Sequence, residues 1–250
     1  MAFRSQKAIG AFVVILLFET GAAAEGLKIS VRHPHLRNSG SGEIQIGESS
    51  ISFRETGKNQ KHSREWAYEE IQQLYVGPNS LRILTYEDVA WKLGSDREHQ
   101  FDRLPEGAAQ QILKAVREHI DERRLVAALS DSSVNPTIWR VKAKLLNRWG
   151  GSDGVVLVGE DAIVYQTDEH NGSRTWDFSH IENVSSSGPF DLTITTFERD
   201  GSRFADRRDF RFQLKTGLTE DRYNALWRRL NESRLSQSLM NTQSKENPNE

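Results

Sequence analysis

The chain contains no cysteine at all. This absence excludes disulfides, thiolate metal sites, iron–sulfur clusters and cysteine nucleophiles. It also has no excess of positive charge, because 33 lysines and arginines stand against 35 acidic residues and give a net charge of -2. A protein without a cationic field lacks the electrostatic footprint of a nucleic-acid binder, so we expect no nucleic-acid partner.

Apolar runs are also scarce, and the one near the N-terminus is short. Arg4 and Lys7 precede an apolar stretch that is too short to cross a bilayer, and small alanines follow it. A basic start, an apolar core and an Ala-x-Ala end are typical of a secretory signal peptide, with cleavage expected between Ala24 and Glu25. An uncleaved N-terminal anchor is the alternative. We therefore expect an exported protein, periplasmic or extracellular.

Motifs that carry catalytic chemistry are missing as well. The sequence has no GxSxG elbow, no HExxH, no Walker loop and no GxGxxG opening a βαβ unit. His33 and His35 lie close together, but no carboxylate stands at helical spacing from them, and His99 has no obvious partner. We expect no enzyme activity, no cofactor and no metal.

What the chain does contain is an internal repeat. Three blocks recur in the same order with a spacing of roughly 110 residues, which is the length of a domain and not of a solenoid unit. The matching blocks are GEIQIGESSISF (42–53) with GVVLVGEDAIVY (154–165), SREWAYEEI (63–71) with SRTWDFSHI (173–181), and GPNSLRILTYE (77–87) with GPFDLTITTFE (188–198).

Apolar residues alternate through these blocks, which predicts several short antiparallel strands in each copy. Each copy then ends in an amphipathic pattern. In the first, Ile112, Val116 and Ile120 recur at helical spacing within 107–128. In the second, Thr219 is a suitable N-cap for the closing helix. Strands followed by a helix indicate an α+β fold.

The expected organisation follows from the repeat. We predict a signal peptide over 1–24, a first domain over 25–129, a polar linker over 130–136, a second domain over 137–235 and a disordered tail over 236–250. Unless the two domains share an apolar interface, we expect them to be weakly coupled.

Each copy resembles the bacterial PH-like domains, the GRAM-like group within the pleckstrin-homology superfold. The resemblance rests on the G-x-[IVL]-x-[IV]-G-E-x-x-I hairpin, the W-x-[YF]-x-x-I strand and the closing helix. It implies two tandem domains, each a small antiparallel β-sandwich or barrel of seven strands with a C-terminal helix plugging one end. It also implies binding of lipids, peptides or proteins, although a fold does not supply a function.

Two residue types recur on the tryptophan strand of both copies. Trp66 and Trp176 are expected to form the centre of each core, with an exposed binding platform as the alternative. Arg64 and Arg174 precede them by two residues and so share their strand face. We expect these arginines to pair with Glu48 or Glu160.

One loop is basic in the first copy alone. Lys58, Lys61, His62 and Arg64 precede the tryptophan strand, whereas the matching loop at 168–172 is acidic. In PH domains such a loop holds anionic headgroups through charge-assisted hydrogen bonds. A solvated hairpin tip is the alternative. The sequence therefore predicts a non-catalytic binding or scaffolding protein with a protein partner, or else a module that binds an anionic lipid headgroup through this loop.

Overall fold

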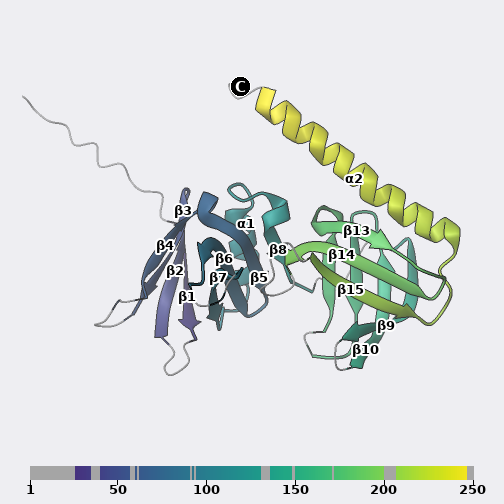
Figure 1. The fold of residues 1–250 in the computed structure, drawn as a ribbon, viewed down its shortest axis with the longest axis horizontal. Coiled ribbons are helices and arrows are strands. Elements are labelled where there is room, and N and C mark those ends of the chain that lie inside the picture. The colour runs from purple at the N-terminus through teal and green to yellow at the C-terminus, as the bar shows by residue number, and fades with distance from the viewer. Residues whose placement is uncertain are drawn as a thin grey trace, which may run out of the picture.

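The computed structural model describes residues 26–34, 40–56, 60, 62–90, 92, 94–130, 136–147, 150–170, 172–199 and 207–246. Two mainly antiparallel sheets dominate it and lie side by side (Figure 1). Each sheet surrounds its own hydrophobic cluster, so the chain has two separate cores. The predicted signal peptide, with Ala24 and Glu25, lies outside the described residues.

The first sheet contains eight strands in the order β4-β3-β2-β1-β7-β6-β5-β8. Its elements are β1 (Leu27–His33), β2 (Gly40–Ile46), β3 (Ser50–Glu55), β4 (Arg64–Ala67), the 3-10 turn η1 (Tyr68–Glu70), β5 (Ile71–Gly77), β6 (Ser80–Asp88), β7 (Asp96–Asp102), α1 (Ala108–Val116), the 3-10 turn η2 (Glu122–Arg124) and β8 (Leu125–Ala127).

The second sheet repeats this order with seven strands, β12-β11-β10-β9-β15-β14-β13. Its elements are β9 (Trp139–Asn147), β10 (Gly150–Val158), β11 (Ala162–Gln166), β12 (Arg174–Asp177), the 3-10 turn η3 (Phe178–His180), β13 (Ile181–Ser185), β14 (Asp191–Arg199), β15 (Arg207–Leu214) and α2 (Glu220–Glu246). The matching strand order and the helix that follows the seventh strand of each sheet confirm an α+β fold of two tandem, mainly antiparallel domains.

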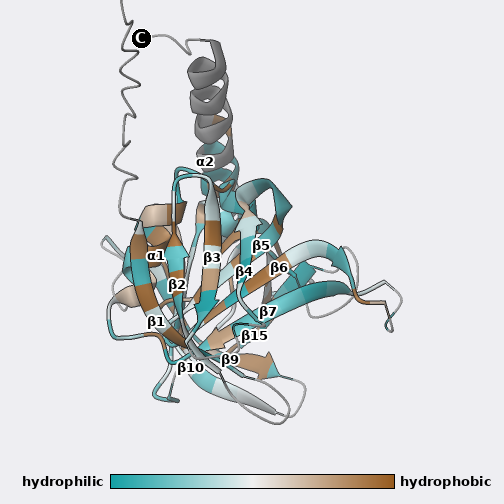
Figure 2. Ribbon diagram, turned by 90° about the vertical axis from the view of Figure 1, so that its left-hand side faces the viewer, coloured by the Kyte–Doolittle hydropathy of each residue, from teal (hydrophilic) through white to brown (hydrophobic). Residues whose placement is uncertain are grey.

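Equivalent residues of the two copies occupy equivalent places in the pairing registers. Ile51 is opposite Trp66 as Ile163 is opposite Trp176. Likewise, Leu81 is opposite Phe101 and Leu192 is opposite Phe212. Burial alternates along the strands, most regularly in β14, and hydrophobic and hydrophilic residues alternate along them in Figure 2. This period of two places one face of each strand in a core.

The glycine that opens the first repeated block is required by close packing. A Cβ atom at Gly42 would overlap the Phe53 ring, and one at Gly154 would overlap the Tyr165 ring. Because Phe53 and Tyr165 are equivalent residues, only glycine lets the two strands of this hairpin approach with a buried aromatic ring between them. The recurrence of this glycine is thus a packing feature.

The end of the first copy differs from the predicted helix over 107–128. Helix α1 stops at Val116, and Asp121 then caps η2 by accepting a 2.8 Å hydrogen bond from the backbone of Arg123. Strand β8 follows and pairs in parallel with β5. Aspartate favours caps over helix interiors, and an added strand satisfies the backbone of an open sheet edge, so both effects end the helix early.

The end of the second copy corrects the expectation of a disordered tail for residues 236–246, and residues 247–250 lie outside the described part of the chain. The backbone of α2 is helical as far as Glu246 and extends well past its sheet (Figure 1). Residues 220–246 contain neither glycine nor proline, and Pro248 stands just beyond the end. The helix therefore has no internal breaker over its described length. Among the described residues, no helix is long and apolar enough to cross a membrane.

Candidate functional site

A glutamate at the end of one strand joins two arginines in each copy. In the first domain, Glu87 accepts ion pairs from Arg64 at 2.9 Å and from Arg97 at 2.7 Å. In the second, Glu198 accepts them from Arg174 at 2.6 Å and from Arg208 at 2.7 Å. The prediction that Arg64 and Arg174 pair with Glu48 or Glu160 is therefore wrong. The sixth strand of each domain, β6 or β14, ends close to the start of β4 or β12, the strand that carries the tryptophan. Glu87 and Glu198 are therefore the glutamates that reach these arginines.

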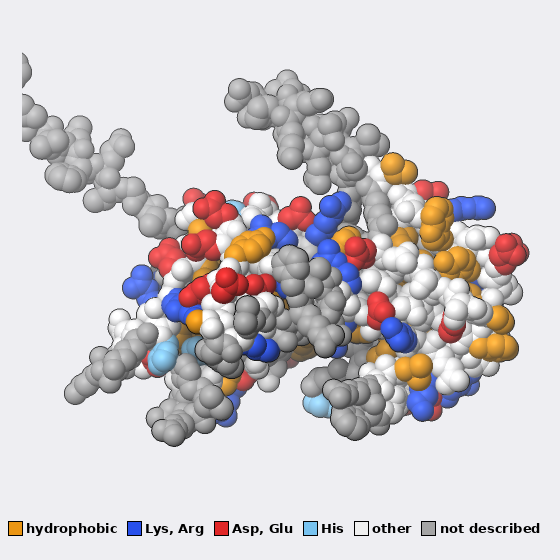
Figure 3. All heavy atoms as spheres, viewed as in Figure 1, with side chains coloured by type: hydrophobic (Ala, Val, Ile, Leu, Met, Phe, Trp, Pro, Cys, Tyr) orange, Lys and Arg blue, Asp and Glu red, His pale blue; other side chains and the backbone are white. Residues whose placement is uncertain are grey.

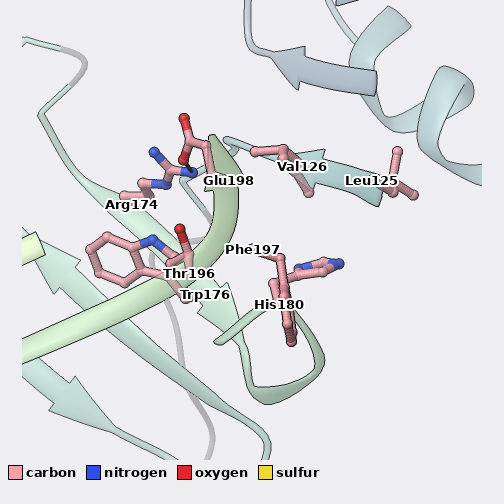
Figure 4. Close-up of a pocket in the computed structure, with 9 residues that line it drawn as sticks. Leu125, Val126, Arg174, Trp176, His180, Thr196, Phe197 and Glu198 are labelled. Atoms are coloured by element: carbon pink, nitrogen blue, oxygen red, sulfur yellow. Dashed lines mark hydrogen bonds and ion pairs between the residues drawn. The ribbon is translucent and has the colours of Figure 1, made fainter. Parts of the chain in front are cut away.

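The two clusters differ sharply in burial. The Arg64 and Glu87 side chains are 43% and 47% exposed, whereas those of Arg174 and Glu198 are 13% and 2% exposed. The Arg174 guanidinium also lies 4.7 Å from the centre of the Phe210 ring. Figure 4 shows Arg174 and Glu198 side by side, with strand β8 of the first domain facing them. Burial makes the second cluster depend far more strongly on complete pairing.

The small cavity beside this second cluster is too narrow for a ligand. It measures about 10 Å³ and is bounded by Val126 and Ala127 of β8 together with Trp176, His180 and Glu198. A single water molecule needs about that much space. The cluster is therefore an ion-pair network within the second domain, beside strand β8 of the first, and the cavity next to it is not a binding pocket.

Polar contacts continue from this cluster across the domain boundary, and we call them the joint. The Gln73 amide donates to the Phe197 carbonyl at 3.0 Å and accepts from the Arg199 backbone at 3.1 Å. The Arg199 guanidinium pairs with Asp96 at 3.0 Å, and both side chains are largely buried. A side-chain amide that clamps a backbone in this way mimics a strand pairing. The domains are thus in specific contact.

Two histidines have pKa values lowered by their surroundings. Burial lowers the pKa of His180, which lies at the joint, while Asp177 and Glu122 oppose that effect. Burial also lowers the pKa of His99 from 6.5 to about 4, with further contributions from Arg64 and His33. The Nε2 atom of His99 has no hydrogen-bond partner among the described residues. His99 packs on Trp66, as Phe210 packs on Trp176, and is therefore a core residue.

The first domain has His99 where the second has Phe210, so we predict that acid lowers the stability of the first domain. Because His99 stays neutral in the folded state down to about pH 4 and protonates near 6.5 when unfolded, its contribution is complete above pH 6.5 and is lost as the pH falls toward 4. Allowing for partial solvent screening, we expect a loss of about 2 kcal/mol over this window. His99→Phe, which copies Phe210, should remove that part of the pH dependence in chemical denaturation series. An unchanged slope would contradict it.

The basic loop predicted to hold an anion is only partly within the described residues. Lys58 and Lys61 lie outside them. The backbone of His62 donates to Glu55 at 3.3 Å, and Arg64 is held by Glu87. The arginine of the predicted site therefore already has a carboxylate partner, as its equivalent Arg174 does.

A surface that the sequence analysis missed lies on the outer face of the second sheet. A hollow of about 780 Å³ extends over β9, β14, β15 and the turn that precedes β14. The Phe190 side chain is 58% exposed at its border, and Leu146 is exposed beside it. In Figure 3, exposed hydrophobic side chains gather more over the second domain, while acidic and basic ones intermix near the middle of the view. The sequence feature that could have indicated this surface is Phe190, an aromatic residue directly after the Gly188-Pro189 turn.

The polar side chains in this hollow are paired with one another. Asp209 accepts from Thr195 at 2.8 Å and pairs with Arg211 at 3.2 Å. Hydrogen bonds from Ser187 hold the pKa of Asp191 below its usual range. No described group of three or more His, Asp or Glu side chains is arranged to hold a metal ion. The hollow therefore combines exposed apolar surface with one ion pair and a hydrogen-bonded carboxylate, which suits contact with a protein surface.

Solved structures resemble this chain at low sequence identity. No protein-family model matches the chain, and neither does any curated protein. The structure of the Spt16D Pob3N heterodimer is 12% identical, with 78% of this chain and 99% of that one covered and a TM-score of 0.31. The C-terminal domain of an unknown protein from Leishmania infantum is 11% identical, with 38% and 83% covered and a TM-score of 0.29. The description of the fold therefore stands on the strand order and helices of this chain alone.

Proposed function

We propose that this protein is an exported, non-catalytic binding protein that holds a protein partner in the hollow of its second domain. The observation that carries the proposal is the contrast in size. The hollow measures about 780 Å³, whereas the cavities at the joint measure about 10 and 20 Å³. Exposed Phe190 and Leu146 supply apolar anchors, and the paired charges around them form a polar rim.

The absence of catalytic activity belongs to the same proposal. The two histidines with lowered pKa values are buried at the joint and in the first core, and neither lines the hollow. Of the described groups with shifted pKa values, Asp191 alone lines the hollow, and hydrogen bonds from Ser187 lower its pKa, so it stays an ionised acceptor with no acid or base beside it that is tuned for proton transfer. Export is proposed from the N-terminal sequence alone, with Glu25 as the first residue of the mature protein.

Affinity capture from the exported fraction of the native host tests this proposal. The bait should be compared with Leu146→Ser together with Phe190→Ser, using quantitative mass spectrometry. Truncating central apolar anchors typically weakens binding by more than about tenfold, so proteins retained specifically by wild type should fall by that factor. Phe190 bonds to Leu214 through its backbone carbonyl, which the substitution leaves intact.

Trp227→Ser is the matched control, because Trp227 is a similarly exposed aromatic residue that lies outside the hollow. This variant should retain the same partners as wild type. Equal recovery of every protein by the wild type and the hollow variant would show that the hollow is not the binding surface.

A further inference from the structure

On the second domain, the joint is formed by the C-terminal end of β14. The equivalent strand of the first domain, β6, has an equivalent end. A β-bulge interrupts the pairing of β14 just before Arg199, and an identical interruption precedes Asp88 in β6. Phe197 and Tyr86 occupy equivalent places in these bulges. Bulges redirect backbone groups away from the ladder. In the second domain those groups reach the Gln73 amide, whereas Tyr86 is 59% exposed to solvent.

The surface that accepts this strand end also exists in both domains. Gln73 is opposite Leu84, and its equivalent Asn183 is opposite Thr195. Asp96 is opposite Asp88, and its equivalent Arg207 is opposite Arg199 in the same way. The second domain thus presents a carboxamide and a charged side chain at the places where the first presents Gln73 and Asp96. Asn183 and Arg207 are both exposed.

At both of these positions, the charge in one domain is opposite in sign to the charge at the equivalent position in the other domain. The joint pairs Arg199 of the second domain with Asp96 of the first. The remaining equivalents are Asp88 on the first domain and Arg207 on the second, which are again opposite in sign. Within each domain, however, the cross-strand neighbours are alike, Asp88 with Asp96 and Arg199 with Arg207. Like charges placed opposite each other are unfavourable, and the joint relieves one member of each pair.

Asp88 and Arg207, the other members of these two pairs, are more weakly compensated by opposite charges. Asp88 forms no ion pair with any described residue. Arg207 pairs with Glu182 at 2.8 Å, donates to the Phe197 carbonyl at 3.3 Å and lies 5.5 Å from the centre of the Phe197 ring. Its side chain is still 42% exposed, and its guanidinium has further donors. A partner that brings a carboxylate to Arg207 and a cation to Asp88 would complete both domains. A second copy of this protein carries both groups in the required positions.

We propose that two molecules associate head to tail, with the β6 end (Tyr86 and Asp88) of one docking on Asn183 and Arg207 of the other. This contact repeats the geometry of the joint with both charges reversed. It is heterologous, so each molecule keeps one donor end and one acceptor surface, and association continues into a ring or an open chain. Within one molecule the linker raises the effective concentration of the joint, so the intermolecular contact is the weaker of the two.

Sedimentation velocity of the full-length mature protein, from micromolar to millimolar concentration, tests this proposal. The wild type should increase in mean mass with concentration, and added salt should reduce the increase. Asp88→Arg and Arg207→Asp each place like charges together, so each should lower the association constant by about tenfold or more. The double variant Asp88→Arg with Arg207→Asp restores opposite charges and should restore association.

Two controls make the result decisive. Glu160→Arg makes the same change of charge at an exposed turn and should associate as wild type does. Leu146→Ser with Phe190→Ser should also associate normally, which separates this surface from the hollow. Because Arg207→Asp removes the pair with Glu182, its thermal melting is measured alongside, and Asp88→Arg supplies the test if that variant unfolds. A wild type that stays monomeric throughout, or a folded double variant that does not recover, would overturn the proposal.

Discussion

Replacing Glu198 by glutamine should lower the free energy of unfolding of the second domain by about 3–5 kcal/mol. The Glu198 side chain is almost completely buried and accepts short ion pairs from Arg174 and Arg208. Glutamine keeps the shape but removes the negative charge, so the largely buried Arg174 loses the charge that compensates its desolvation. Arg208 reaches solvent and is less affected. Chemical denaturation of the domain gives the measurement.

The first copy provides the matched control. Glu87→Gln removes the equivalent charge from Arg64 and Arg97, but all three side chains are about one-third to one-half exposed. Exposed ion pairs contribute at most about 1 kcal/mol, so this variant should unfold nearly as wild type does. Equal losses for the two variants would show that burial at the joint does not set the strength of the second cluster.

Much of the fold could be predicted from the sequence, because it depends on local patterns. The alternation of apolar residues in the repeated blocks gave the strands, and their spacing gave two domains in the same register. Trp66 and Trp176 are buried in their cores, as expected. The recurring hydrophobic positions predict the strands because every second residue of a strand faces the core. This alternation can be recognised within a segment of a few residues.

The contacts that join distant segments could not be predicted in this way. Arg174 and Glu198 lie more than twenty positions apart, and only the path of the chain from β12 to β14 brings them together. Strand β8 could not be predicted, because Ile112, Val116 and Ile120 have helical spacing and suggest a longer helix. Ile120 is buried although the helix ends before it. The joint depends on Gln73 and Arg199, polar residues with no periodicity to mark them. The hollow is lined by residues of several strands and a turn, and the pattern of a single strand does not mark it.

Replacing Trp176 by alanine should destabilise the second domain by about 3–5 kcal/mol, the usual cost of removing a large aromatic side chain from a core. Trp176 packs 4.7 Å from the centre of Phe210 and 6.1 Å from that of Phe212. Trp66→Ala should affect the first domain in the same way. Differential scanning calorimetry should show one transition moved far down in each variant. This loss is large against a domain stability of about 5–15 kcal/mol.

The joint determines what happens to the other transition. Each of its hydrogen bonds contributes about 0.5–1.5 kcal/mol, so unfolding of one domain should lower the melting temperature of the other by a smaller amount. Trp227→Ala is the matched control, because this tryptophan is 48% exposed on α2 and its loss should change stability by less than about 0.5 kcal/mol. If Trp176→Ala instead melts like Trp227→Ala, then Trp176 does not hold the core, and its interaction with Arg174 becomes a feature of binding.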